Sequence, residues 1–322
     1  MKRRSCGALS WMVVGVLLCA GAGEARAQEP EPEPEVAAEP GAPAFRRHVL
    51  YYQTGTFARW NPIGLGNLSQ VGYRYMFFDS EAELLRGSYA MVGLAPGLNP
   101  AFSRIGPMVE VQPLAVLRLT AMWERIDHFG TFDILQSWPS PRDDHSDTAR
   151  AARGEEGESY ATSATQVTLA ARAQAKVWRI AARVNYRAVY SEADLKEGDH
   201  VYWDSFFDQV MPDGGWLQTT DTDVLYVDGP LALGLRHNWL SVDYPDGFYR
   251  PGESRRDPND QHRLGPLFAW KFAESPGSAF DEPTLFVLVN WWLQHRYRTG
   301  EDVSQWVPYT IVGFSFKGEL LP

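Results

Sequence analysis

The stretch from Ala164 to Tyr190 constrains the fold more than any other, because its side chains alternate in chemical character at every second position. Successive side chains of a β-strand point to opposite faces. In the second half of the stretch, one face carries Trp178, Ile180, Ala182, Val184, Tyr186, Ala188 and Tyr190, and the other carries Arg179, Ala181, Arg183, Asn185, Arg187 and Val189. The first half alternates in the same way up to a predicted turn at residues 174–176.

A helix is the competing interpretation, because Ala and Arg both favour helices. At about 100° per residue, however, Arg179, Arg183 and Arg187 would fall within the apolar stripe. The period of two separates the two classes, so we predict a hairpin of two long strands. Each arm exceeds the roughly 5–6 residues of a usual strand and reaches the roughly 9–11 that cross a bilayer. One apolar face and one arginine-bearing face are typical of a wall between lipid and water.

The N-terminus has the features of a secretory signal peptide. Three basic residues at positions 2–4 precede an apolar run over residues 9–20, and Ala-Arg-Ala at residues 25–27 forms a small-x-small cleavage pattern. We therefore predict a cleaved signal peptide over residues 1–27 and export through the Sec pathway. Lipidation of Cys19 is the alternative, although Leu18 stands where a lipoprotein signal has Gly or Ala.

The chain left after this cleavage is acidic and lacks cysteine. The removed segment carries a net charge of +3, so the formal charge changes from −10 to −13. Both cysteines, Cys6 and Cys19, lie in the removed segment, which excludes a disulfide framework and thiol chemistry. Residues 28–45 are rich in Pro and Glu and cannot bury a core, so we predict a disordered leader there.

The remaining chain, residues 46–322, repeats the period-two pattern. No segment approaches 18 continuous apolar residues, so no transmembrane helix is predicted. Besides the two arms of the 164–190 hairpin, we predict strands near residues 47–57, 68–78, 88–98, 104–112, 116–126, 220–228, 231–244, 263–272, 284–297 and 304–317. That gives about twelve, an even number as in single-chain bacterial barrels. Long connections at residues 127–159, 191–219 and 245–261 alternate with tight turns at residues 113–115, 174–176 and 229–230.

Short turns at one end and long loops at the other are typical of outer-membrane barrels. Over about residues 46–318 the chain resembles the bacterial outer-membrane β-barrel class, which is porin-like. The resemblance implies an all-β, closed antiparallel up-and-down transmembrane barrel in the outer membrane of a Gram-negative cell. It also implies contact with outer-membrane lipid and lipopolysaccharide, and with the barrel-assembly machinery. The chain departs from the class at its end, because Pro322 is the last residue and Phe316 the nearest aromatic. A soluble, secreted β-protein with its apolar face turned inward is the alternative fold.

The polar faces of the predicted strands are rich in arginine. We predict that the lumen is lined by Arg74, Arg118, Arg172, Arg179, Arg183, Arg187, Arg236, Arg263, Lys271 and Arg296, with Glu110 and Glu124 as acidic counterparts. The opposite faces predict lipid contact for Trp178, Ile180, Val184, Leu233, Leu235, Val287, Val289 and Trp291. Charged linings of a narrow water path select ions by sign, and arginine binds carboxylates and phosphates with two parallel hydrogen bonds.

The predicted function is therefore passive passage of small, anionic solutes. One alternative is a plugged barrel, structural or surface-binding, in which the arginines pair with Glu110, Glu124 and loop carboxylates. A rim hydrolase is a further alternative, since His145 lies near Asp143 and Asp147, but no G-x-S-x-G or H-E-x-x-H motif is present. No cofactor, metal site or nucleic-acid partner is expected.

The second long loop is unusually aromatic, with Tyr202, Trp203, Phe206, Phe207 and Trp216. These side chains either cap the barrel mouth or lie in the outer aromatic girdle. We favour the cap, because so much apolar surface in one loop should be buried.

Overall fold

The alternating stretch forms two long antiparallel strands, β9 (Thr162–Val177) and β10 (Ile180–Ala193), which pair along their whole length. The computed structural model in which they are seen describes residues 45–255, 259–300 and 306–320. The hairpin prediction is confirmed, but the turn lies at residues 178–179 instead of 174–176. The predicted signal peptide and all but the last residue of the predicted leader lie outside the described residues.

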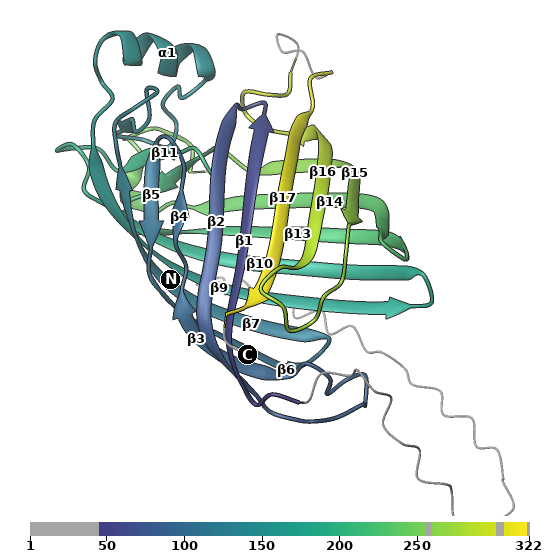
Figure 1. Ribbon diagram of the computed structural model, residues 1–322. Coiled ribbons are helices and arrows are strands. Elements are labelled where there is room, and N and C mark those ends of the chain that lie inside the picture. Colours follow the sequence, from purple (N-terminus) through teal and green to yellow (C-terminus); the bar gives the residue numbers. More distant parts are fainter. Residues whose placement is uncertain (1–44, 256–258, 301–305, 321–322) are drawn as a thin grey trace, which may run out of the picture. The chain divides into compact units, whose positions relative to one another are not determined.

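The sheet closes on itself through its first and last strands (Figure 1). β1 (His48–Trp60) pairs with β2 (Gly64–Met76) on one side and with β17 (Tyr309–Glu319) on the other, antiparallel in both cases. The wall also includes β7 (Leu117–His128), β13 (Gly215–Asp228), β14 (Leu231–Asp243), β15 (Gln261–Lys271) and β16 (Asp281–Gln294).

Two strands of the wall are interrupted. One consists of β3 (Tyr89–Leu94) and β4 (Gly97–Leu98), and the other of β5 (Phe102–Ile105) and β6 (Pro107–Leu114). Pro96 has no N–H to donate at the first break. At the second break, a Cβ on Gly106 would lie 1.7 Å from the carbonyl oxygen of Trp123, so only glycine fits. The Ala95 N–H still donates to the Gly106 carbonyl at 2.9 Å, which joins the two interrupted strands. With each of them counted once, the barrel has 12 strands, as predicted.

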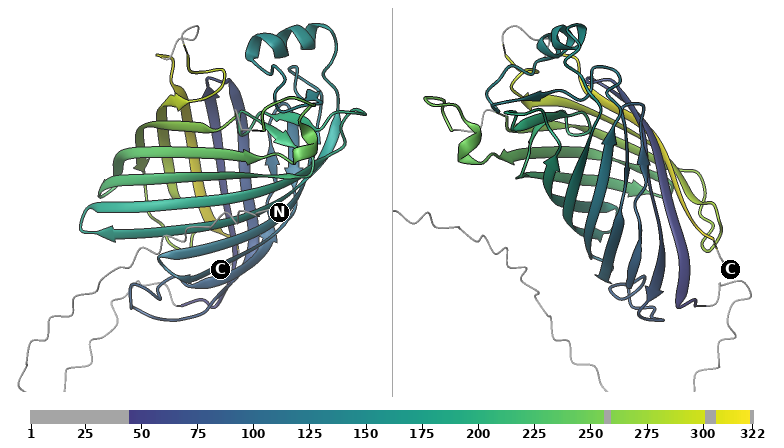
Figure 2. Two further views of the ribbon diagram at one scale, coloured as in Figure 1. Left: turned by 180° about the vertical axis from the view of Figure 1, so that it is seen from behind. Right: turned by 90° about the vertical axis from the view of Figure 1, so that its left-hand side faces the viewer.

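The longest connections lie at one end of the barrel, and three two-residue turns lie at the other (Figure 2). The long connections at residues 129–161 and 194–214 lie at one end, together with the described residues 244–255, 259–260, 295–300 and 306–308 and the short connections 61–63 and 99–101. The two-residue turns at 115–116, 178–179 and 229–230 lie at the other. Consecutive antiparallel strands alternate in direction, so every second connection lies at the same end, and the turn end also carries the longer connections 77–88 and 272–280. We call the two ends the loop end and the turn end.

The outward face of the wall is apolar. On β10, Ile180 and Val184 are 46% and 40% exposed, and on β14 Leu233 and Leu235 are 47% and 55% exposed. Soluble proteins rarely leave a continuous apolar surface of this extent uncovered. Exposed aromatic side chains accompany this surface near both ends: Trp60, Trp216 and Trp291 toward the loop end, and Tyr73, Tyr75 and Phe272 toward the turn end. An apolar band between aromatic girdles around a polar interior defines a transmembrane barrel of the outer-membrane class.

The part of the chain that the structure describes contains no helix that is long and apolar enough to span a bilayer. Its longest helix is α1 (Asp147–Glu155), which belongs to the loop end. A small sheet lies beside it, formed by β8 (Ser137–Trp138), β11 (Val201–Asp204) and β12 (Gln209–Pro212). The short helix η1 (Asp246–Phe248) completes this layer, which we call the cap.

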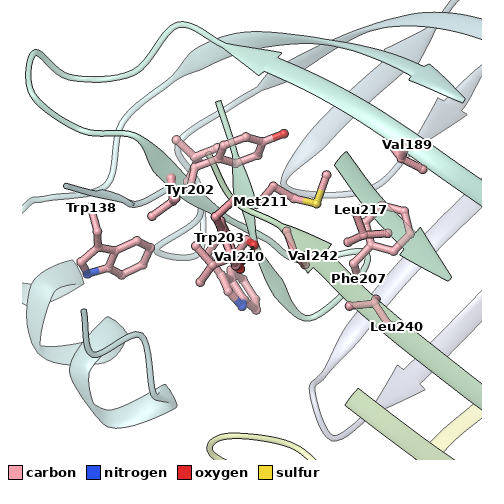
Figure 3. Close-up of a cluster of buried hydrophobic side chains, with 13 residues drawn as sticks. Trp138, Val189, Tyr202, Trp203, Phe207, Val210, Met211, Leu217, Leu240 and Val242 are labelled. Carbon is pink, nitrogen blue, oxygen red and sulfur yellow. Dashed lines mark hydrogen bonds between the residues drawn. The ribbon is translucent and has the colours of Figure 1, made fainter. Parts of the chain in front are cut away.

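The cap has its own apolar core, which joins it to the wall (Figure 3). Tyr202, Trp203 and Phe207 are buried there with Leu217 and Leu240 of the wall, and Phe206 packs against the cluster. The predicted cap is thus confirmed for these four aromatic residues. Trp216 differs, because it is exposed on β13 with its ring centroid 5.3 Å from that of Tyr190. The period of two turns it outward, into the girdle.

The assignment of the outward face predicts how stability responds to charge. Val184→Arg should lower the free energy of unfolding in a bilayer by about 2–4 kcal/mol, because the guanidinium would enter lipid. Gln53→Arg is the control, since Gln53 lines a luminal cavity, and its cost should be far smaller. Urea unfolding in lipid vesicles measures both, and equal costs would contradict the assignment.

Candidate functional site

The barrel lumen is the candidate site, because the inward face concentrates charge around a cavity. The cavity has a volume of about 500 Å³ and is lined by side chains from several strands of the wall. Five arginines and two carboxylates line it: Arg118, Arg172, Arg183, Arg187, Arg236, Glu110 and Asp221. The lining is therefore basic, although the chain as a whole carries a charge of −10.

Asp223 is the most tightly held carboxylate in the lumen. Its side chain is fully buried and binds two arginines from neighbouring strands. Arg183 donates from Nε and Nη2 at 2.8 and 2.6 Å, and Arg236 donates from Nε and Nη2 at 2.6 and 2.9 Å. The register explains the contact, because Asp223 lies opposite Arg183 on β10 and opposite Arg236 on β14. One negative charge thus neutralises part of two positive ones.

The other luminal carboxylates each hold one arginine. Arg104 donates through Nε to Glu124 at 2.8 Å, and Arg187 reaches Asp221 at 3.4 Å. Arg118 lies 3.8 Å from Glu110, whose other carboxylate oxygen accepts from Thr120 at 3.2 Å. The predicted pairing of arginines with Glu110 and Glu124 is therefore present, and the lumen still contains the cavity of about 500 Å³.

Of the predicted arginines that lie in the lumen, three have no carboxylate within ion-pair distance among the described residues: Arg74, Arg172 and Arg263. Arg172 donates to the side-chain oxygen of Asn185 at 2.6 Å. Arg74 lies against the rings of Tyr51 and Tyr89, at 3.4 and 4.0 Å from the centroids. Neutral partners leave the charge of a guanidinium uncompensated, so the lumen retains positive potential.

The loop end of the lumen is filled by residues 201–212, which we call the plug hairpin. It consists of β11, β12 and the turn between them. Phe206 and Phe207 in this turn line luminal cavities together with wall residues. Arg59 of β1 donates to the carbonyl oxygens of Ser205 and Phe206 at 2.6 and 3.0 Å. The hairpin is therefore fastened to the wall and obstructs the mouth at the loop end.

A buried ion pair holds the end of the turn in the plug hairpin, where β12 begins. Asp208 accepts from Nε and Nη2 of Arg298 at 2.6 and 3.0 Å, and Gln261 donates to its carbonyl at 2.7 Å. Burial alone would raise the pKa of Asp208, but the guanidinium of Arg298 outweighs it and holds that pKa well below the ordinary value. Arg298 also reaches Asp147 of α1 at 3.1 Å, so it links the plug hairpin to the helix.

Two buried histidines at the loop end, His145 next to α1 and His295 beside Asp208 of the cap, resist protonation. Burial, reinforced by Arg296, lowers the pKa of His145 to about 3. Burial lowers the pKa of His295 to about 4, although Asp208 opposes the shift. His145 lies 3.1 Å from the carbonyl oxygen of Asp143, whose carboxylate binds Arg250. In the suggested rim hydrolase, His145 would act with Asp143 or Asp147. Arg250 binds the carboxylate of Asp143, and Arg298 binds that of Asp147. The enzyme alternative stays a prediction.

The structure moves three of the predicted site residues. Trp178 and Arg179 form the β9–β10 turn, because the strands run further than expected, so neither lies on a strand face. Arg179 donates to the Tyr226 hydroxyl at 2.8 Å outside the lumen. Arg296 follows the end of β16 and donates to the carbonyls of Pro141 and Arg142 at 3.0 and 2.6 Å. That strand begins and ends about three residues earlier than predicted.

The remaining predicted residues lie on the expected sides. Lys271 turns inward at the turn end and pairs with Glu274, away from the cavity lining. The inward arginines are Arg74, Arg118, Arg172, Arg183, Arg187, Arg236 and Arg263. The outward residues are Ile180, Val184, Leu233, Leu235, Val287, Val289 and Trp291, since they alternate along their strands with residues that line the lumen.

Sequence reasoning missed several luminal residues. Asp221 and Asp223 alternate with Thr222 and Val224, so the period-two rule could have found both. Arg104 could have been found in the same way from its neighbours in the sequence. Arg59 lies beyond the predicted end of the first strand, and its role depends on a loop that no local pattern locates. Its role is determined by the contacts that it makes with the plug hairpin.

Comparison with known proteins finds only distant likenesses. No protein-family model matches the chain, and no curated protein sequence matches it. Among solved structures, the translocator domain of autotransporter NalP from Neisseria meningitidis aligns with a TM-score of 0.36 and 8% identity, covering 84% of this chain and 87% of that one. OccD3 from Pseudomonas aeruginosa gives 0.29 and 13%, covering 85% and 92%. OmpT of Vibrio cholerae, an outer membrane protein, gives 0.32 and 7%, covering 84% and 98%.

The Asp223 cluster predicts a large cost for a small change. Asp223→Asn should lower the free energy of unfolding by about 1–3 kcal/mol, because it leaves two guanidinium groups without their shared charge. Asp228→Asn is the matched control: Asp228 pairs with Arg179 at the exposed turn, where such a pair contributes about 0–1 kcal/mol. Denaturant unfolding in detergent micelles compares the two, and similar losses would show that the luminal cluster is not stabilising.

The cap should loosen as the pH falls. Above about pH 6.5, His145 and His295 are neutral whether the cap is closed or open. Below that value an opened cap takes up protons that the closed cap excludes, so closure loses stability down to pH 3–4, where the lowered pKa values lie. Asp208, with its depressed pKa, stabilises closure above about pH 4 and loses that effect at lower pH.

Protease accessibility of the cap, measured between pH 7 and pH 4, tests this expectation. Cleavage within residues 194–214 should increase with acidity while the wall stays intact. His145→Phe should shift the onset to lower pH, whereas His48→Phe, at the turn end, should not. An accessibility independent of pH would contradict the assignment.

Proposed function

We propose that this protein is an outer-membrane channel for small anionic solutes, described here with its loop-end mouth closed by the plug hairpin. The observation that carries the proposal is the lining of the 500 Å³ cavity, in which five arginines face two carboxylates. In a narrow water path of low dielectric surroundings, such an excess favours anions and repels cations.

The cavity shares lining residues with two neighbouring cavities in the lumen. A second cavity under the plug hairpin shares Arg187, Asp221 and Arg236 with the first, and a third shares Glu110 and Arg187. Solutes in the lumen would therefore meet arginine along its length. The obstruction lies at the plug hairpin, whose turn is fastened by both Arg59 and Arg298.

Passage then requires the plug hairpin to leave the mouth. The hairpin contains no cysteine that could cross-link it to the wall. Its fastening consists of hydrogen bonds, the Asp208–Arg298 ion pair and the packing of its apolar side chains in the cap core, including Tyr202, Trp203 and Phe207. The plugged structural barrel is the alternative, in which the same contacts hold permanently. Contacts with lipopolysaccharide and the barrel-assembly machinery stay predictions.

Reconstitution in planar bilayers tests the proposal. The wild type should conduct rarely. Replacement of Phe206 and Phe207 by glycine together with Arg59→Gln should raise the open probability, because it removes the apolar anchor and the carbonyl contacts. Under a potassium chloride gradient the reversal potential should show chloride preference. Conductance that stays absent in this variant would contradict the channel and favour the plugged structural barrel.

Ion selectivity tests the role of the arginines separately. In the same plug variant, Arg172→Glu should reduce or reverse the chloride preference, because Arg172 has only an amide partner in the lumen. Arg179→Glu makes the same charge change at the turn outside the lumen and should leave the preference unchanged. Equal effects of the two substitutions would indicate that surface charge, and not the lumen, determines selectivity.

A further inference from the structure

Directly beneath the plug hairpin lies a smaller cavity with a composition different from the rest of the lumen. Its volume is about 190 Å³, below the roughly 300–1,000 Å³ of pockets for drug-sized ligands. Apolar side chains make up much of its wall, while a few polar groups converge on it. The apolar lining comprises Phe57, Leu68, Phe206, Phe207, Leu240, Phe286, Leu288 and Ile311.

Asn290 is the feature of this cavity that calls for a ligand. It lines the cavity and is 1% exposed, and neither its side-chain nitrogen nor its oxygen has a hydrogen-bond partner among the described residues. A buried polar atom without a partner costs about 1–3 kcal/mol. A side chain with two such atoms beside a cavity can be completed by a molecule that enters that cavity.

Arg263 supplies a charge beside it. Its guanidinium lies 4.0 Å from the ring centroid of Tyr309 and 4.8 Å from that of Trp292, and it donates to Asn238 at 2.6 Å. The structure describes no carboxylate within ion-pair distance of it. The two rings and Asn238 fix the orientation of the guanidinium, so a ligand would meet a preorganised donor.

We propose that this cavity binds a small monocarboxylate with an apolar body. The carboxylate would accept from Arg263 and from the amide nitrogen of Asn290, and the body would pack on Phe207 and Leu288. Four arginines line the cavity, but Arg187 and Arg236 are paired with Asp221 and Asp223, and Arg59 donates to the carbonyls of Ser205 and Phe206. Arg263 alone is left to meet the charge of a ligand, which favours a monoanion over a dianion such as phosphate. The inference rests on the proposed function, because the luminal path would bring the ligand to this place, and it names the solute class.

The ligand would also touch the plug hairpin. Phe206 and Phe207 contribute to the cavity lining from the hairpin turn, while Asn290 and Arg263 contribute from the wall. Occupation of the cavity would therefore place the solute in contact with the element that closes the mouth.

Benzoate is the probe, titrated into the full-length protein in detergent micelles and followed by tryptophan fluorescence, with Trp292 adjacent to Arg263, and by calorimetry. We expect saturable binding, weakened about tenfold or more by Arg263→Gln, since a hydrogen bond to a charged group contributes about 1.5–3 kcal/mol. Asn290→Leu should weaken it several-fold. Arg179→Gln, with the same loss of charge at the turn, should bind like the wild type. Neither benzyl alcohol nor inorganic phosphate should compete.

Heat-modifiable electrophoretic mobility checks that each variant is folded, and the Asn290 variant keeps the test valid if the Arg263 variant is not. Absence of saturable benzoate binding, binding that both variants retain in full, or equal competition by benzyl alcohol would overturn the pocket. Chloride-selective conductance with no benzoate binding would overturn the pocket and leave the channel. Benzoate binding in a barrel that never conducts would overturn the channel and support the pocket.

Discussion

The pairing of β1 with β17 is the constraint on which the rest of the structure depends. In the hydrocarbon of a bilayer no water satisfies a free strand edge, so each backbone N–H and carbonyl of the wall must find a partner within the sheet. Residues Tyr51 to Trp60 of β1 pair with Glu319 to Thr310 of β17 and remove the last open edge. Closure then fixes which face is inside, and with it the side of every alternating residue.

Once the faces are fixed, the charges of the lumen become a question of balance. Inward arginines point away from the lipid. Their positive charge is neutralised where a carboxylate on a neighbouring strand pairs with them. Asp223 does so for two arginines, and Glu124 does so for Arg104. The arginines that meet amides or rings instead retain their charge, and the proposed anion preference originates from these residues.

The period of two made much of this fold predictable from the sequence. It is a local property, so the strand number, the sorting of loops and the direction of Val184 or Arg183 followed from counting. It could not locate the turn at Trp178 and Arg179, because the alternation continues unchanged through the predicted and the observed position. It could not show that Arg296 leaves the wall, because its partners are carbonyls of a loop about 150 residues away in the sequence.

The candidate site was less predictable for the same reason. The basic character of the lumen is a sum over strands, and it could be anticipated. The cavity beneath the plug hairpin depends on the position of Phe206 and Phe207, which come from a loop with no period. The sequence indicated that this loop is apolar enough to bury itself, but not that its turn enters the mouth or that Asn290 would be left without a partner there.

The plug hairpin has one further mechanical effect. The cap core in which its side chains pack includes Leu217 of β13 and Leu240 of β14, while its turn is tied to Arg59 on β1 and to Arg298 beyond β16. It thus spans the mouth and connects strands of the wall that do not pair with each other, β1 on one side and β13 and β14 on the other. While the plug hairpin is in place, the loop end of the barrel cannot flatten without breaking these contacts. When the plug hairpin leaves the mouth, the loop-end parts of β13 and β14 lose their inner support. Amide hydrogen exchange in those strands would therefore report whether the hairpin is in place.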